Sequence, residues 1–296
     1  MRKSLIQNEQ IIKKASMLKI PAHKLAESLK SGNFRSLYKG QGIEFEGVRE
    51  YIRGDDVRSI DWNVTARLDR PYVKIFREER EFQLFLIIDN SNSMMLNYFG
   101  KSKYDACSEA VALLTIAAQI NCCPIGAVFF DGEINFSIKP KLDKNQSMLI
   151  LNQLAYENEK KQNGSDLEKA INGAGKLLKK RTLVFIFADF KTENWQKSAV
   201  MLAQKNDLVA VRITDEFDYK MPNLGTTVFQ DSESRVKMVL PTSSKNFQTF
   251  WTDYQNQKND NWESFCIKHG ILPVFMKTTD DPFKVLNEVL KKRKKE

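Results

Sequence analysis

The stretch that decides the fold is Leu84–Met94, which reads LFLIIDNSNSM. Its first five residues are bulky and apolar, which is typical of a strand buried on both faces of a parallel sheet. The run ends in Asp89, and Ser91 and Ser93 follow at alternate positions. Chemistry in such sheets gathers just past the carboxyl ends of the strands. Carboxylate and hydroxyl oxygens suit a hard cation such as Mg²⁺ or Mn²⁺, although Asp-Asn-Ser clusters are also ordinary turn formers.

The composition indicates a globular chain with a large core. The chain has 296 residues, 42% of them hydrophobic, and a net charge of +9, which is compatible with an acidic protein surface, nucleic acid or anionic lipid as a partner. The longest nearly apolar stretch, Ala110–Ala118, is shorter than the ~20 residues that cross a bilayer. The N-terminus lacks the apolar core of a secretion signal, and the cysteines form no CxxC pair. We therefore expect a cytoplasmic protein with no membrane span and no zinc site.

From residue 83 onward, strand and helix patterns alternate. Strands are expected at 84–89, 125–130, 182–188, 208–213 and 271–275, and helices at 104–118, 144–155, 165–179, 195–204, 243–268 and 282–293. The segment Asp131–Glu133 begins with Asp-Gly, a hairpin signal, between two β-like runs. The sequence thus predicts a doubly wound, mostly parallel α/β domain with one antiparallel edge strand.

The first eighty residues differ from the rest. Residues 5–31 have helix-like spacing that Pro21 interrupts, and Gly32–Arg80 is rich in Gly, Asp, Arg and aromatic residues without a helical period. A short strand is expected at Tyr72–Phe76. We therefore divide the chain into an N-terminal segment, residues 1–82, and an α/β domain, residues 83–296, that ends in a basic tail.

Two further loops complement the Asp89 turn. An apolar run over residues 182–188 ends in Asp189, and Ser165 stands at the start of a predicted helix, where it could serve as N-cap. These loops and the Asp89 turn lie at or near the same edge of one sheet, so their side chains can converge. The candidate metal ligands are Asp89, Ser91, Ser93, Ser165 and Asp189.

This set resembles the metal-ion-dependent adhesion site of von Willebrand factor A domains. In that family the first loop reads DxSxS, the second supplies a threonine and the third an aspartate. Asp89, Ser91 and Ser93 match the first loop, Asp189 matches the third, and Ser165 keeps the hydroxyl of the usual threonine. The resemblance implies a Mg²⁺ ion with one coordination position left open for a Glu or Asp of a partner protein.

The N-terminal segment resembles a narrower bacterial family, the domain of unknown function 58 proteins. The matching motifs are GxEF at Gly42–Phe45, REYxxGDDxRxIDW at Arg49–Trp62, TAR at Thr65–Arg67 and VKxFxEER at Val73–Arg80. The family carries an A-type domain behind this signature. The resemblance implies an adaptor or co-chaperone of a MoxR-type AAA+ ATPase, in a family without an established enzymatic activity.

The acidic residues of the signature have two interpretations. Asp55, Asp56 and Asp61 could form a second acidic site, catalytic or cation-binding. We favour a structural network, because the nearby Arg53, Arg58 and Arg67 can neutralise them.

Two other function classes stay open. A metal-dependent hydrolase or phosphotransferase could use Asp89 as nucleophile, but the chain lacks a GxxxxGK[ST] loop and a GxSxG elbow, and Ser91 stands where haloacid-dehalogenase-type enzymes have a second Asp. A nucleic-acid-binding protein is compatible with the net charge, but the sequence contains no recognition motif.

Overall fold

The computed structural model describes residues 20–29, 42–68, 70–79, 83–96, 100–155, 164–230 and 237–292. The chain forms two compact units. The smaller unit is Asn33–Glu81, and the larger unit combines Met1–Gly32 with Phe82–Glu296.

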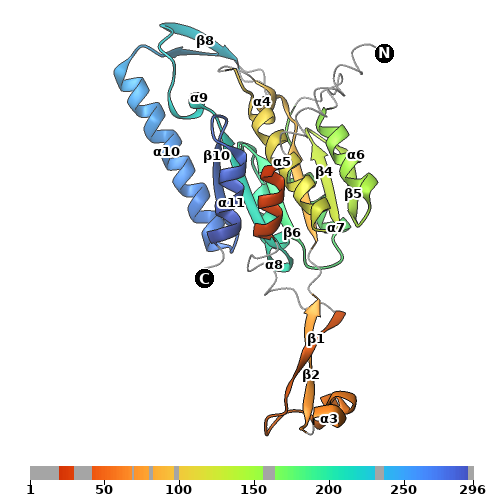
Figure 1. Ribbon diagram of the computed structural model, residues 1–296. Helices are drawn as coiled ribbons and strands as arrows, with labels where there is room; N and C mark the ends of the chain where they lie inside the picture. Colours follow the sequence, from red (N-terminus) through yellow and green to blue (C-terminus); the bar gives the residue numbers. More distant parts are fainter. Residues whose placement is uncertain are drawn as a thin grey trace. The chain divides into compact units, whose positions relative to one another are not determined.

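The larger unit is built on a six-stranded sheet in the order β10-β7-β6-β3-β4-β5 (Figure 1). Its first five strands are parallel, and β5 pairs antiparallel with β4 at one edge. This order confirms the predicted fold class, a doubly wound, mostly parallel α/β domain with one antiparallel edge strand. The strands are β3 (Leu84–Asp89), β4 (Ile125–Phe130), β5 (Ile134–Lys141), β6 (Leu183–Ala188), β7 (Asp207–Thr214) and β10 (Leu272–Lys277).

Helices cover both faces of this sheet, which is why every residue of β3, β4, β6 and β7 is buried. On one face, α7, α8 and α10 pack against the strands around Phe85, Trp195 and Trp262. On the other face, α5 contacts both α6 and α11. The helices are α4 (Asn92–Met95), α5 (Lys103–Ile120), α6 (Lys144–Ala155), α7 (Leu167–Leu177), α8 (Trp195–Lys205), α9 (Glu216–Tyr219), α10 (Lys245–Lys268) and α11 (Pro282–Lys292).

A helix over residues 20–29 packs on the larger unit, between α5 and α11 (red in Figure 1). Its apolar face, which includes Leu25 and Leu29, is buried. Asn121, just after α5, donates from Nδ2 to the Ala26 carbonyl over 2.9 Å, and Ser28 Oγ donates to Asn287 Oδ1 of α11 over 2.7 Å. The predicted division at residue 82 places this helix with the signature segment instead. The remaining residues of the predicted 5–31 helix lie outside the described ranges.

Most of the predicted elements of the larger unit are present. The five parallel strands lie within two residues of their predicted ends, and β5 continues to Lys141. The sequence patterns did not predict α4, α9 or the hairpin of β8 (Thr226–Gln230) and β9 (Lys237–Pro241). These elements are short, and the hairpin exposes Val228 and Val239, so burial does not impose a clear alternating pattern on it.

The free edge of β10 has few backbone donors. Thr278 N donates to Thr214 O of β7, which places the even-numbered residues of this strand toward β7 and the odd-numbered residues toward the outside. Of the odd-numbered residues, Pro273 has no N–H, and Lys277 N donates to Asp280 Oδ2 over 2.8 Å. Phe275 is left as the outward-facing backbone donor of β10.

In the smaller unit, β1 (Gly42–Glu50) pairs antiparallel with β2 (Tyr72–Glu79), with a bulge between Phe45 and Gly47. The strand predicted at Tyr72–Phe76 is confirmed and extends three residues further. The sequence pattern predicts no helix within Gly32–Arg80. This expectation is wrong, because a 3₁₀ turn at Val57–Ser59 and the helix α3 (Trp62–Leu68) lie between the two strands in the chain.

Candidate metal centre

The first loop of the candidate site begins where β3 ends. Asn90 N donates to Phe130 O at the end of β4, which fixes the start of the loop. The next turn closes on Asp89, whose Oδ1 accepts from Ser91 N over 2.9 Å. Ser91 precedes α4, but its hydroxyl makes no cap bond and lies 3.1 Å from Ser93 Oγ instead. The DxSxS sequence thus places one carboxylate and two hydroxyls together.

The second loop contributes Ser165, which lies beside Asp89. Ser165 Oγ donates to Asp89 Oδ2 over 3.0 Å. The sequence pattern suggests Ser165 as the N-cap of α7. In the structure the N-cap is Asp166, whose side chain accepts from Lys169 N. Asp166 N also donates to Asp131 O over 2.8 Å, which anchors the loop at the end of β4. Because Asp166 caps the helix, the Ser165 hydroxyl is available to the site.

The third loop contributes Asp189, a buried carboxylate directly after β6. Its Oδ1 accepts from Lys191 N over 3.2 Å, whereas its Oδ2 is buried without a hydrogen-bond partner. Burial raises the pKa of Asp89 to about 7, and the charge of Asp189 adds to this shift. Hydrogen bonds from Ser91 and Ser165 act in the opposite direction. Two interacting carboxylates therefore share one buried site.

The donors of this site fit a hard divalent cation. All five predicted residues offer oxygen, from three hydroxyls and two carboxylates. Among the described residues there is no group of three or more His, Cys, Asp or Glu side chains that could hold a metal, so a cation here would depend on the serines. Hydrogen bonds join four of the predicted residues, and Asp189 interacts with Asp89 through its charge.

The sequence patterns did not predict the charged network beside Asp189. Lys191 Nζ lies 2.7 Å from Asp218 Oδ1, and Lys103 Nζ lies 2.7 Å from Asp218 Oδ2. Arg212, on β7, places its guanidinium 5.5 Å from the centre of the Trp262 ring. No spacing could have indicated these contacts, because they join α5, the third loop, β7 and α9.

In the smaller unit the three acidic residues have separate local partners. Asp55 accepts two hydrogen bonds of 2.7 Å from the Arg49 guanidinium, which holds the pKa of this carboxyl near 2. Asp56 accepts from Arg58 N, and Asp61 accepts from two backbone N–H groups and lies 3.9 Å from Lys74 Nζ. Each of these carboxylates thus has its own local contacts, and the side chains paired with Asp55 and Asp61 are Arg49 and Lys74. The expected neutralisation by Arg53, Arg58 and Arg67 side chains is wrong for the contacts that the structure describes.

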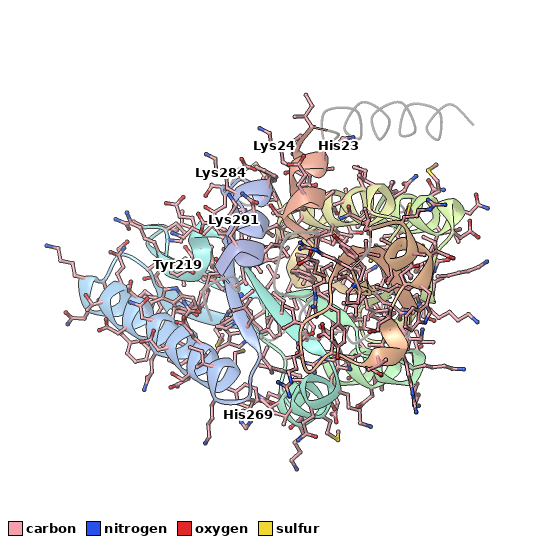
Figure 2. The ribbon with its side chains drawn as sticks, turned by 60° about the horizontal axis from the view of Figure 1, so that its bottom comes forward. His23, Lys24, Tyr219, His269, Lys284 and Lys291 are labelled. Carbon is pink, nitrogen blue, oxygen red and sulfur yellow. The ribbon has the colours of Figure 1, made fainter. Side chains whose placement is uncertain are left out.

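Neither histidine belongs to the candidate metal centre. His23 lies on the helix over residues 20–29, and His269 caps the C-terminal end of α10, where its ring lies 4.6 Å from that of Phe265. Figure 2 shows the two histidines on opposite sides of the view. The described helices include none that is both long and apolar enough to cross a bilayer.

The chain is similar to several proteins without an assigned function. The model of a family described as protein of unknown function DUF58 matches residues 47–261. An uncharacterized protein of Mycobacterium tuberculosis is 28% identical over 207 residues, which cover 69% of this chain and 65% of the relative. The match therefore spans less than two thirds of that relative's length.

Solved structures with similar architecture are more distant in sequence. The solved chain of the conserved hypothetical protein BatB from Bacteroides thetaiotaomicron has a TM-score of 0.46 at 15% identity, and the match covers 73% of this chain and all of that solved chain. The SpRpn10 VWA domain has a TM-score of 0.36 at 10% identity, over 71% of this chain and 94% of that domain.

Proposed function

The chain belongs to the DUF58 family, and from this premise we propose that it is a non-enzymatic, metal-dependent protein-binding module. In this proposal Mg²⁺, or Mn²⁺ in its place, is held by Asp89, Ser91, Ser93, Ser165 and Asp189. A bound cation would supply an electrophilic position that a carboxylate of a partner protein can complete.

One observation carries the proposal. The buried Oδ2 of Asp189 has no hydrogen-bond partner, and the charge of Asp189 acts on Asp89, which is fully buried as well. Buried carboxylates are normally paired with a cation or coordinate a metal. A divalent cation would offset both charges and use the hydroxyls that already surround Asp89.

The residues of the chain prepare the site in distinct ways. The N–H of Ser91 and the hydroxyl of Ser165 orient Asp89, and the N–H of Lys191 orients Asp189. The three hydroxyl ligands carry no formal charge, so the two carboxylates neutralise a divalent ion without giving the site an excess of negative charge. A carboxylate from outside the chain could therefore still bind at an open coordination position.

The family resemblance supports a MoxR-type AAA+ ATPase as the partner, with the chain acting as its cytoplasmic adaptor or co-chaperone. The partner carboxylate would come from the ATPase itself or from its client. A metal centre that recognises a single acidic side chain suits such a role, because binding can depend on metal without any chemical change in the partner.

Isothermal titration calorimetry with MgCl₂ tests the metal site. The wild type should bind one Mg²⁺ ion, and Asp89→Ala should abolish the binding signal because it removes a ligand. Asp253→Ala removes an exposed carboxylate of α10 and should bind as the wild type does. Binding by Asp89→Ala at wild-type strength would exclude this site.

Affinity purification tests the function. Partners that are captured by the wild type, and lost both in Asp89→Ala and in wild type treated with EDTA, would be ligands of the metal centre. If every partner is retained in all three samples, the metal-dependent role is wrong. Turnover of a phosphate ester that Asp89→Asn abolishes would instead support a phosphotransferase.

A further inference from the structure

We propose that Asp218 is a positioning residue of the metal centre: it holds the Lys191 ammonium away from Asp189, so that the Asp189 carboxylate stays available to a cation. This inference rests on the proposed function, because it concerns access to the same site. It assigns a role to two charged residues that are not ligands themselves.

Lys191 makes a backbone contact with Asp189 and a side-chain contact with Asp218. Its backbone N–H donates to Asp189 Oδ1, and its ammonium lies 2.7 Å from Asp218 Oδ1. Within the described residues, the ion pairs of Lys191 do not include one to Asp189. The two carboxylates nevertheless both act on its ammonium, and together they raise the pKa of Lys191 against partial desolvation.

Asp218 is held in place by α5 and by its own short helix. Its Oδ2 accepts from the backbone N–H of Asp215, and its N–H donates to Asp215 Oδ1, which forms a closed capping box. The same Oδ2 lies 2.7 Å from the ammonium of Lys103, a side chain that is 3% exposed. Lys191 and Lys103 lower the pKa of Asp218 despite its burial. An ionised, fixed carboxylate is therefore always present to hold Lys191.

Loss of the Asp218 charge would change the partner of Lys191. After Asp218, the carboxylate that acts most strongly on the Lys191 ammonium is Asp189, whose Oδ2 has no hydrogen-bond partner. An ammonium paired with this oxygen would neutralise the charge that a divalent cation needs. Arg212, the other cation that acts electrostatically near Asp189, stacks on Trp262 instead. Lys191 is thus an internal competitor for the metal, and Asp218 restrains it.

Mg²⁺ titrations of three variants test the role of Asp218. Asp218→Asn should weaken Mg²⁺ binding about 10- to 100-fold, as is typical when a group outside the ligand set is lost. Lys191→Met should bind at least as tightly as the wild type, because the competitor is gone. The double variant Asp218→Asn/Lys191→Met should regain affinity to within about threefold of the wild type. If it stays as weak as Asp218→Asn, Asp218 acts only by supporting α9 and the inference is wrong.

A metal-free measurement separates this inference from the proposed function. In urea unfolding, Lys191→Met and Asp189→Asn should be only weakly coupled in the wild-type background, because the ammonium is paired with Asp218 and acts on Asp189 from a distance. In the Asp218→Asn background their coupling should be about fivefold or more stronger in the unfolding equilibrium, because a new ion pair has formed. Equal coupling in both backgrounds would overturn the inference even if Mg²⁺ binds. If the two substitutions show the stronger coupling in the Asp218→Asn background but the wild type does not bind Mg²⁺, only the proposed function is overturned.

Discussion

The hydroxyl of Ser165 donates to the buried carboxylate of Asp89 over 3.0 Å, although the two residues are 76 positions apart in the chain. This contact joins the loop after β3 to the loop before α7 at the carboxyl edge of the sheet. It leaves Asp89 oriented but not neutralised, because the nearby charge is another carboxylate. The predictions that concern the site follow from this imbalance.

Replacing Asp89 with Asn should stabilise the metal-free protein. Burial and the charge of Asp189 raise the pKa of Asp89 from 3.8 to about 7, so the ionised form is unfavourable in the folded state. At pH 8 the free energy of unfolding of Asp89→Asn should exceed that of the wild type by about 2 kcal/mol. One pKa unit corresponds to about 1.4 kcal/mol, and relaxation of the folded protein around the charge reduces the full effect. Urea denaturation in EDTA measures it, and Asp253→Asn serves as the control. A marked loss of stability in Asp89→Asn would contradict the charge imbalance.

The same shift predicts how this stabilisation depends on pH. A folded-state pKa above the unfolded value means that the protonated Asp89 contributes stability fully below pH 3.8, and that this contribution is lost as the pH rises through about 7. The difference in unfolding free energy between Asp89→Asn and wild type should therefore be small at pH 4 and grow toward pH 8. A difference that does not change with pH would show that Asp89 has an ordinary pKa.

Mg²⁺ binding should strengthen with pH and release a proton. Below pH 7 the Asp89 carboxyl must lose its proton before it can bind a metal, so affinity should rise by up to about tenfold per pH unit and level off near pH 8. Calorimetry in two buffers of different ionisation enthalpy gives the number of protons released. Equal heats in both buffers at pH 6.5 would mean that no proton leaves on binding.

The helix over residues 20–29 should stabilise the larger unit. Leu25 is completely buried, so Leu25→Ala should lower the free energy of unfolding by about 2–4 kcal/mol. Lys24, its exposed neighbour on the same helix and labelled in Figure 2, gives the matched control Lys24→Ala, which should change stability by less than about 0.5 kcal/mol. Equal midpoints for both variants would mean that this helix does not pack on the larger unit in solution.

Gly126 should tolerate no side chain. A Cβ atom there would lie 2.7 Å from Ile138 O and from Pro140 N, both backbone atoms of the adjacent edge strand β5. Gly126→Ala should therefore cost about 1–3 kcal/mol by forcing β4 and β5 apart. Gly47→Ala is the control, because nothing lies within 4 Å of a Cβ at that position. Denaturation curves of the two variants decide the comparison.

The fold could be predicted from sequence where burial dictates the residue type. Strands β3, β4 and β6 are buried on both faces, so their apolar runs are continuous and their ends are sharp. The carboxylates at those ends could be located for the same reason, since Asp89 and Asp189 each follow directly on such a run. Parallel strands then bring them to one edge of the sheet.

The parts that could not be predicted depend on contacts between distant polar side chains. The cap of α7 shows this on a small scale: Ser165 and Asp166 are both good N-cap residues, and only the structure shows that Asp166 takes the role. The pairing of Lys191 with Asp218 depends on where a four-residue helix, α9, places its side chains. Asp55 pairs with Arg49, six residues away, and sequence spacing does not distinguish this arginine from Arg53 or Arg58.

The sparse donors at the β10 edge have a consequence for how this protein can associate. With Pro273 lacking an N–H and Lys277 bonded to Asp280, an incoming strand would find one outward-facing backbone donor, that of Phe275. Such an edge resists polymerisation of the sheet from chain to chain, which open parallel edges otherwise invite. Copies of this protein at high concentration would therefore stay separate along this edge.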